Sequence, residues 1–252
     1  MQRTIVAAIT ALVMIVPRVN AEPVANGIAV LDRAATEKKY AFVLFFKEDN
    51  ELTAAQRKVF DAALAKLSDK ALPCVVNAGN PAEKEIVAKF RVASAPMPLV
   101  LAVAPNGAIT GGFPGQFDEP ALLGAIASPN MQQCLKALQE RKLVFVCVQS
   151  GTTKLNDKAM QGVTDFKADA RYAKLTEIIK VDPTDAGEQK LLGQLQVDPK
   201  ATEATTAFLA PPGMVLGKFQ GATEKKTLEA ALQKASSGCG SGASSGCCSP
   251  KK

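Results

Sequence analysis

Two segments with apolar residues at helical spacing each run directly into an unbroken apolar stretch. The first segment covers residues 28–39 and leads into Tyr-Ala-Phe-Val-Leu-Phe-Phe at 40–46. The second covers 131–142 and leads into Leu-Val-Phe-Val-Cys-Val at 143–148. A strand without a polar face is buried on both sides, as in the centre of a sheet that helices cover. The pattern therefore predicts, twice, a helix followed by a central strand.

The similarity between the two halves continues along the chain. Val75-Val76-Asn77 and Ile179-Lys180-Val181 each read as a strand that is followed by a polar turn and the start of a helix. Each half then has another apolar strand, a turn rich in Pro and Gly, and a closing helix, at 119–127 and 224–235. This internal repeat predicts the order helix–β–α–β–α–β–β–α in both halves. Because the linker at 128–130 is short, we expect two closely packed domains.

This order of elements resembles the thioredoxin-like superfamily over residues 25–127 and again over 130–235. In the first half the resemblance is carried by the strand at 40–46 before a long helix, and by the Ala-Pro-Asn-Gly turn at 104–107 followed by Phe-Pro-Gly. It implies an α/β fold with two tandem thioredoxin-like domains, each a central mixed sheet flanked by helices.

The resemblance also implies a cis-proline ahead of the strand at 99–103, where the chain reads Pro96-Met97-Pro98. Spacing from the upstream helix favours Pro96 for that role, whereas spacing from the hairpin turn favours Pro98, which we prefer. Two ordinary trans prolines at the start of a strand are the alternative. The second half has no proline at this place, and Thr205 stands near it.

The redox turn of the thioredoxin-like fold is degenerate in both halves. The two positions that hold cysteines in thioredoxins fall at Asn50 and Thr53 in the first half, and at Thr153 and Asn156 in the second. Thiol–disulfide exchange needs an attacking thiolate and a resolving thiol. The chain therefore resembles the non-catalytic domains of the disulfide isomerases. It resembles calsequestrin in architecture alone, because the acidic excess is missing.

The N-terminus has the pattern of a secretory signal peptide. Met1-Gln2-Arg3 is followed by an apolar run at 4–16 and by the small residues of Val19-Asn20-Ala21, which predicts cleavage after Ala21. A short membrane anchor is the alternative, although the run is too short to span a bilayer comfortably. We expect export to the periplasm or the exterior, with no membrane span after cleavage. The predicted boundaries are a signal peptide at 1–21, domains at 22–128 and 129–235, and a disordered tail at 236–252.

The six cysteines form two groups. Cys74, Cys134 and Cys147 fall in predicted strands or helices, where cysteine usually acts as a small apolar side chain; a Cys134–Cys147 or Cys74–Cys147 disulfide is the alternative. Cys239, Cys247 and Cys248 lie in a Gly/Ser-rich tail. These tail thiols could bind a soft metal such as Cu(I) or Zn(II), pair with one another, or link the chain to a partner. No other metal or cofactor is expected.

Composition excludes several classes of function. The chain of 252 residues has no histidine, which excludes His-based general-base catalysis and His-ligated zinc. Its formal charge of +6 falls to about +2 for the folded body without Arg3, Arg18 and the two C-terminal lysines, too little for binding to a nucleic-acid backbone. Acidic residues beside the turn at 50–53 suit the N-terminus of a helix.

These observations favour a non-enzymatic, exported tandem protein that binds an unidentified protein or peptide, or serves as a scaffold. The alternative is thiol-dependent metal binding or disulfide exchange through the tail. A third hypothesis is a spacer within an envelope assembly.

Overall fold

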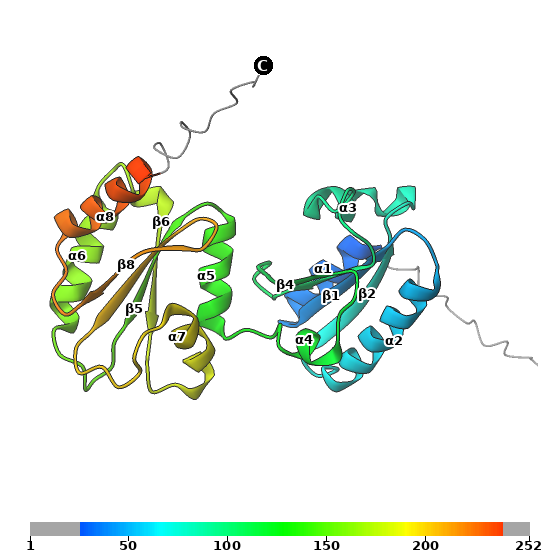
Figure 1. Ribbon diagram of the computed structural model, residues 1–252, viewed down its shortest axis with the longest axis horizontal. Coiled ribbons are helices and arrows are strands. Elements are labelled where there is room, and N and C mark those ends of the chain that lie inside the picture. The colour runs from blue at the N-terminus through cyan, green and yellow to red at the C-terminus, as the bar shows by residue number, and fades with distance from the viewer. Residues whose placement is uncertain (1–25, 239–252) are drawn as a thin grey trace, which may run out of the picture.

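The computed structural model describes residues 26–238, and within them it contains two sheet domains joined by a short connection (Figure 1). Each domain has a four-stranded mixed sheet with helices on both faces. The strand order is β2-β1-β3-β4 in domain 1 and β6-β5-β7-β8 in domain 2. The first pair in each sheet is parallel and the other two pairs are antiparallel.

The elements follow the order predicted from the repeat, with a short 3₁₀ helix (η) before α3 and two more in domain 2. Domain 1 comprises α1 (Gly27–Thr36), β1 (Tyr40–Phe46), α2 (Glu51–Lys66), β2 (Ala71–Asn77), η1 (Pro81–Glu83), α3 (Lys84–Phe90), β3 (Leu99–Val103), β4 (Ile109–Pro114) and α4 (Glu119–Leu123). Domain 2 comprises α5 (Pro129–Gln139), β5 (Leu143–Val148), α6 (Asn156–Ala168), η2 (Ala173–Leu175), β6 (Thr176–Val181), η3 (Ala186–Glu188), α7 (Gln189–Leu195), β7 (Thr205–Ala210), β8 (Met214–Gln220) and α8 (Lys225–Gly238).

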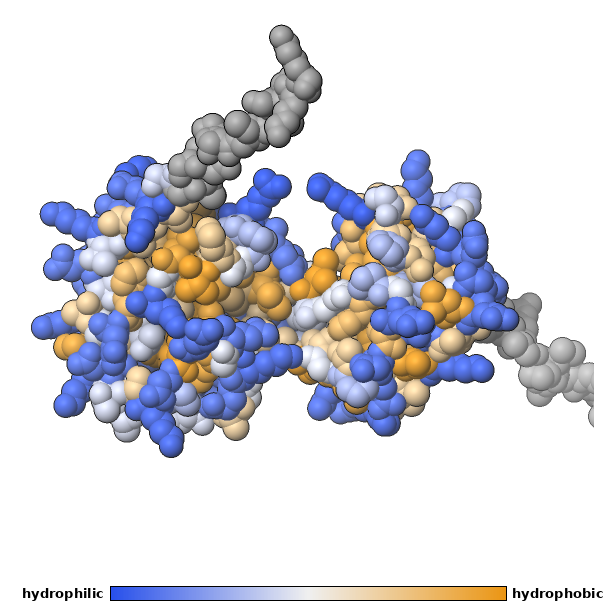
Figure 2. Space-filling view, viewed as in Figure 1, coloured by the Kyte–Doolittle hydropathy of each residue, from blue (hydrophilic) through white to orange (hydrophobic). Residues whose placement is uncertain are grey.

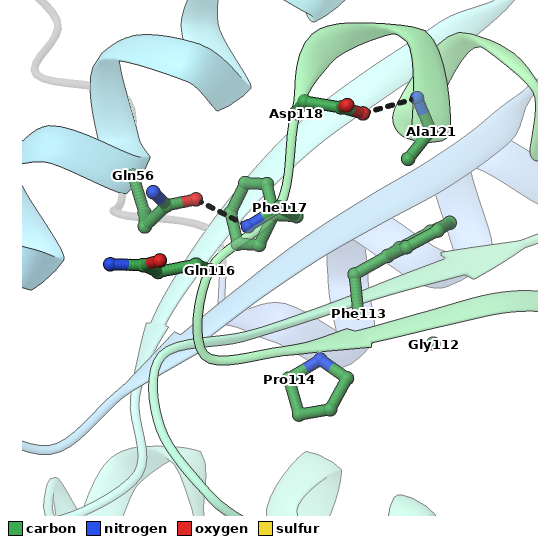
Figure 3. Close-up of a pocket in the computed structure, with 8 residues that line it drawn as sticks. All are labelled: Gln56, Gly112, Phe113, Pro114, Gln116, Phe117, Asp118 and Ala121. Atoms are coloured by element: carbon green, nitrogen blue, oxygen red, sulfur yellow. Dashed lines mark hydrogen bonds between the residues drawn. The ribbon is translucent and has the colours of Figure 1, made fainter.

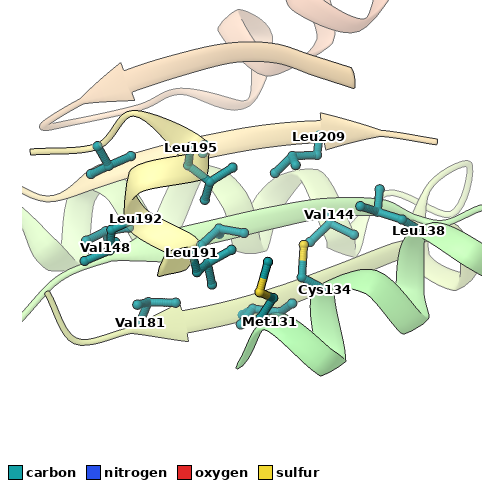
Figure 4. Close-up of a cluster of buried hydrophobic side chains, with 14 of the residues drawn as sticks. Met131, Cys134, Leu138, Val144, Val148, Val181, Leu191, Leu192, Leu195 and Leu209 are labelled. Atoms are coloured by element: carbon teal, nitrogen blue, oxygen red, sulfur yellow. The ribbon is translucent and has the colours of Figure 1, made fainter. Parts of the chain in front are cut away.

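The unbroken apolar strands are buried on both faces, as their composition predicts. Alternate residues of β1 enter two different cores: Val43 and Phe45 pack with α1 and α3, whereas Phe42 and Leu44 pack with α2 and α4. β5 divides its side chains in the same way between the α5–α7 core (Figure 4) and the α6–α8 core. Burial of these side chains from water is what holds the helices on the sheet.

The repeat extends to a glutamate in each domain, the half-buried Glu83 and the buried Glu188. The Glu83 Oε2 accepts a hydrogen bond from the Gly27 N–H at 2.9 Å. Glu188 is 2% exposed and accepts from the Ser128 hydroxyl at 2.7 Å and the Asn130 side-chain amide at 3.0 Å. In both domains a glutamate therefore ties the segment before α3 or α7 to the N-terminus of the first helix, where negative charge is favourable.

The domains contact each other through α5 and the linker. The Tyr40 hydroxyl donates to the Ala127 carbonyl at 3.1 Å and accepts from the Ala127 N–H at 2.9 Å. On α5, the Gln139 amide bonds both main-chain groups of Ile109, at 2.9 and 2.7 Å. Leu135 packs against cores of both domains. The contact thus joins side chains of domain 2 to the end of the sheet in domain 1.

The two closing helices differ from their predicted bounds. α4 ends at Leu123, four residues before the predicted end, and Gly124 forms its C-cap. α8 instead continues through Gly238. Hydroxyls of Ser236 and Ser237 bond to the Gln233 carbonyl one turn earlier, so the first three residues of the predicted disordered tail are helical. The predicted signal peptide and the remaining residues of the predicted tail lie outside the described residues.

Candidate functional site

The turn after β1 is held by its own polar side chains. Asn50 is the N-cap of α2, and its Oδ1 accepts a hydrogen bond from the Thr53 N–H at 2.9 Å. Thr53 is buried, and its hydroxyl donates to the Glu48 carbonyl at 2.9 Å. The two predicted degenerate redox positions of domain 1 therefore lie together, and each satisfies a main-chain group at the helix start.

The proline loop before β3 is open in domain 1. The Met97–Pro98 peptide is cis, and the Pro98 carbonyl accepts from the Gly115 N–H at 2.7 Å. Pro96 lies two residues earlier and is exposed. The Lys47 ammonium donates to the Ala93 carbonyl at 2.7 Å, which ties the end of β1 to this loop. Within residues 26–238, neither the N–H nor the C=O of Met97 makes a hydrogen bond to another group of the chain.

The corresponding turn in domain 2 is built differently. The Thr153 hydroxyl lies 2.7 Å from the Asn156 Oδ1 and 3.0 Å from the Ser150 carbonyl. The Asn156 side-chain amide donates to the same carbonyl at 2.8 Å. Leu155 has a φ of 62° and 38% of its surface exposed, an uncommon backbone conformation for a bulky residue. The pair Thr153 and Asn156 is thus bonded within one compact polar turn.

This turn also pairs with the segment before β7. The Lys154 N–H donates to the Thr202 carbonyl at 2.9 Å, and the Ala204 N–H donates to the Lys154 carbonyl at 2.9 Å. Ala204 occupies the place that Pro98 has in domain 1, because its carbonyl accepts from the Gly221 N–H at 2.7 Å. The sequence had suggested Thr205, one residue later. In domain 2 the main chain of this turn is therefore bonded to the segment before β7, a pairing that domain 1 lacks within the described residues.

The strand order and the helix that starts at the end of the central strand are the same in both domains and define the fold. Both domains have a thioredoxin-like fold. The four positions that the sequence predicts to be degenerate, Asn50, Thr53, Thr153 and Asn156, lie at the two turns that follow β1 and β5.

No protein-family model matches the sequence, and no curated protein matches it. Among solved structures, the first two thioredoxin domains of Saccharomyces cerevisiae Eps1p are 8% identical, with 82% of this chain and 96% of that chain covered and a TM-score of 0.32. The zinc-bound form of human ERp44 is 10% identical over 83% of this chain and 59% of that chain, with a TM-score of 0.34. The thioredoxin Deadhead of Drosophila melanogaster is 16% identical over 40% of this chain and 90% of that chain, with a TM-score of 0.33. Sequence identities and TM-scores this low support no conclusion about function.

A wide hollow of about 610 Å³ lies in domain 1 between α2, β4 and the start of α4 (Figure 3). The buried Gln56 of α2 accepts a hydrogen bond from the Phe117 N–H at 2.9 Å. The Asp118 carboxylate is engaged as the N-cap of α4. The sequence prediction missed this hollow, although a glutamine on the buried face of an amphipathic helix is a signal that could have indicated it. Its lining residues are Gln56, Gly112, Phe113, Pro114, Gln116, Phe117, Asp118 and Ala121.

The three cysteines of the described part are buried free thiols. Burial raises the pKa of Cys74 to about 12 and that of Cys134 and Cys147 to about 11. Since the thiolate is the reactive form, these three side chains act as core residues. The predicted tail thiols Cys239, Cys247 and Cys248 lie outside the described residues.

Two kinds of site are not found between residues 26 and 238. No cluster of three or more cysteine or acidic side chains is arranged to hold a metal ion. No helix in that part of the chain is both long and apolar enough to cross a membrane.

Proposed function

We propose that the chain is an exported, redox-inactive tandem thioredoxin-like protein that binds an extended segment of another protein at the proline loop of domain 1. The observation that carries this proposal is the main chain of Met97, whose N–H and C=O are both without a partner in the described residues. An extended peptide could pair with these groups by strand addition.

The hydrogen bonds of domain 2 differ at the corresponding place, and this difference supports a peptide site in domain 1 rather than in domain 2. The main-chain groups of Lys154 and Ala204 are already bonded to each other across the equivalent groove. The bonds from Lys154 to Thr202 and from Ala204 to Lys154 tie the counterpart of Met97, Glu203, to the turn before α6, whereas the segment around Met97 has no such main-chain tie within the described residues. We thus assign peptide binding to domain 1 and a supporting role to domain 2.

The polar residues at the two turns support a non-catalytic role. Asn50 and Thr53 serve to cap α2, and Thr153 and Asn156 bond to each other. The buried cysteines hold their protons because of their raised pKa values. The low charge of the folded body and the N-terminal pattern support a protein partner in an exported compartment.

An NMR titration of the ¹⁵N-labelled chain with reduced, carboxymethylated α-lactalbumin, a permanently unfolded probe, tests the proposal. We expect saturable shifts of the Met97 amide signal and its neighbours. The Ala204 amide is the internal control, because its hydrogen bond to Lys154 protects it. A probe that shifts Ala204 but not Met97, or that shifts neither, would refute binding at domain 1.

The second candidate function is a thiol role of the tail. It is favoured by the burial of the other three cysteines, which leaves Cys239, Cys247 and Cys248 as the remaining candidates for reactive thiols. Thiol titration and bound copper or zinc would be measured on the chain with and without residues 239–252. Equal values for the two forms would exclude this role.

A further inference from the structure

The hollow of domain 1 has a counterpart in domain 2. A hollow of about 600 Å³ lies beside β8 and the start of α8, against about 610 Å³ in domain 1. The two linings match in register, because Phe113 and Phe219 hold the same position on β4 and β8. Counted from these phenylalanines, each of the seven residues that line the hollow of domain 2 has its counterpart in domain 1. The eighth lining residue of domain 1 is Gln56 of α2, whereas no described residue of α6 lines the hollow of domain 2.

The two linings differ in chemistry. Pro114 and Phe117 give the hollow of domain 1 apolar walls beside Phe113. At the same two places the hollow of domain 2 has Gln220 and Thr223. On the face drawn in Figure 2, hydrophobic and hydrophilic side chains alternate over both domains and form no single broad apolar face. A recess with aromatic walls is therefore a local feature of domain 1, and such walls favour another aromatic ring in offset or edge-on contact.

Gln56 brings an unpaired donor to the hollow of domain 1. The residue is 8% exposed, and its Oε1 accepts a hydrogen bond from the Phe117 N–H at 2.9 Å (Figure 3). Since a main-chain N–H bonds only an acceptor, the other end of this side-chain amide is the Nε2 group with its two N–H donors. That group makes no hydrogen bond within residues 26–238. A shielded donor without a partner is unfavourable, so an occupant with an oxygen acceptor is favoured here.

The hollow also adjoins the proposed peptide site. Pro114, in its wall, pairs with Leu99, which directly follows Pro98. Adjacent strands lie about 5 Å apart. A long side chain of a segment bound at Met97 can therefore reach the hollow.

We propose that this hollow takes a tyrosine side chain of the extended segment that binds at Met97, an inference that rests on the proposed function. The ring would lie against Phe113 and Phe117, and its oxygen would accept a hydrogen bond from the Gln56 amide. The hydroxyl proton finds an acceptor in the same wall. One oxygen of Asp118 caps α4, which leaves the other for the tyrosine.

Other side chains match these groups less well. Phenylalanine brings no acceptor to Gln56. The indole N–H of tryptophan and the cationic groups of lysine and arginine can only donate. Asparagine and glutamine carry an acceptor but have no ring for the aromatic walls. Tyrosine meets both requirements.

The chain itself offers no suitable tyrosine, because it has two and both are engaged. Tyr40 is buried, and its hydroxyl bonds both main-chain groups of Ala127. Tyr172 is half-buried and stacks on Phe166. A second copy of the chain therefore cannot supply the tyrosine, and neither can residues 1–25 or 239–252, which contain none. The occupant belongs to another protein.

The test compares two short capped peptides of serine and alanine that differ only in a central tyrosine or phenylalanine. Each is titrated into the ¹⁵N-labelled full chain. The tyrosine probe should give saturable shifts of the Gln56 side-chain amide signals together with the Met97 amide. It should bind about tenfold more tightly than the phenylalanine probe, which leaves the Gln56 donors unpaired. Gln56→Leu should remove this preference, so that the two probes bind within about twofold of each other.

The matched control is Gln161→Leu, the same substitution at an exposed position of α6, which should keep the preference for tyrosine. Equal binding of the two probes by the unaltered chain would overturn the inference, as would a preference that survives in Gln56→Leu. If that variant does not fold, the ratio measured on the unaltered chain and the Gln56 side-chain shifts still decide.

The same titrations separate this inference from the proposed function. Shifts at Met97 with equal affinity for both probes would leave peptide binding at the proline loop standing and refute the tyrosine site. Shifts at Gln56 without any shift at Met97 would refute the proposed function, and with it the assignment of the tyrosine to a segment bound there.

Discussion

At the residue scale, Gly162 marks the closest approach of main chains in domain 2. A Cβ added at Gly162 in α6 would lie 1.7 Å from the carbonyl oxygen of Thr223, a main-chain atom just before α8. Only glycine fits there. We expect Gly162→Ala to destabilise the fold by about 2–4 kcal/mol, because the whole α8 entry must move. Urea unfolding followed by circular dichroism would measure this loss.

Gly193 provides the control for that experiment. It lies in α7, and a Cβ added there meets nothing within 4 Å. Alanine restricts the unfolded chain more than glycine does, so Gly193→Ala should stabilise by about 0.5–1 kcal/mol. If Gly162→Ala were as harmless as Gly193→Ala, α6 would not pack against Thr223 as described.

Turns follow β1 and β5, as the ends of the two apolar runs predict; the correspondence of their polar residues to a redox pair stays a prediction. The sequence did not predict that the turn of domain 2 pairs with the segment before β7. That pairing depends on hydrogen bonds from Lys154 to Thr202 and from Ala204 to Lys154, which join segments far apart in the chain. Local hydrophobic periodicity carries no information on such pairing.

At the scale of elements, an ion-pair network connects α8 to the end of α6. The Asp169 carboxylate lies 2.7 Å from both Arg171 and Lys225, and Arg171 also contacts Glu229 at 2.7 Å. Hydrogen bonds from Arg171 and Lys225 hold the pKa of Asp169 well below its usual range. The network therefore joins the loop after α6 to the first turns of α8.

This network predicts a pH-dependent contribution to stability. Because the folded-state pKa of Asp169 lies below the unfolded value of about 4, its stabilising effect is present above that pH and is lost as the pH falls below it. Asp169→Asn should lower the free energy of unfolding at pH 7 and have a smaller effect at pH 3. Urea unfolding at both pH values measures the difference.

The control for this prediction is Lys225→Gln, combined with Asp169→Asn in a double-mutant cycle. If Asp169 acts through Lys225, the effects of the two substitutions are not additive at pH 7. Equal destabilisation by Asp169→Asn at pH 7 and pH 3 would show that the carboxylate does not stabilise the fold through its charge.

Sequence patterns defined the central strands well and the ends of the closing helices less well. β1 and β5 were predicted with little error, because an unbroken apolar run has only one way to be buried in a covered sheet. The ends of α4 and α8 were predicted less well. α4 stops at Gly124, where the chain turns so that Ala127 can reach Tyr40, whereas two serine hydroxyls bond to the last turns of α8. Both depend on contacts that periodicity does not contain.

At the scale of the whole molecule, the two domains are placed by a small number of contacts at the linker. The Tyr40 hydroxyl bonds both main-chain groups of Ala127 at the end of domain 1. Ser128 and Asn130, the next polar residues, bond to Glu188 of domain 2. The linker is thus attached to both domains within a few residues.

Tyr40→Phe should loosen this arrangement, because it removes the acceptor of the buried Ala127 N–H. An unsatisfied buried donor costs about 1–3 kcal/mol. We expect that loss in urea unfolding and a larger radius of gyration by small-angle X-ray scattering, as the domains separate more often. Tyr172→Phe is the control, since the Tyr172 ring stacks on Phe166 in domain 2 and its hydroxyl makes no hydrogen bond to the described residues. A Tyr40→Phe chain with unchanged radius and stability would show that the linker is held by Glu188 and α5 alone.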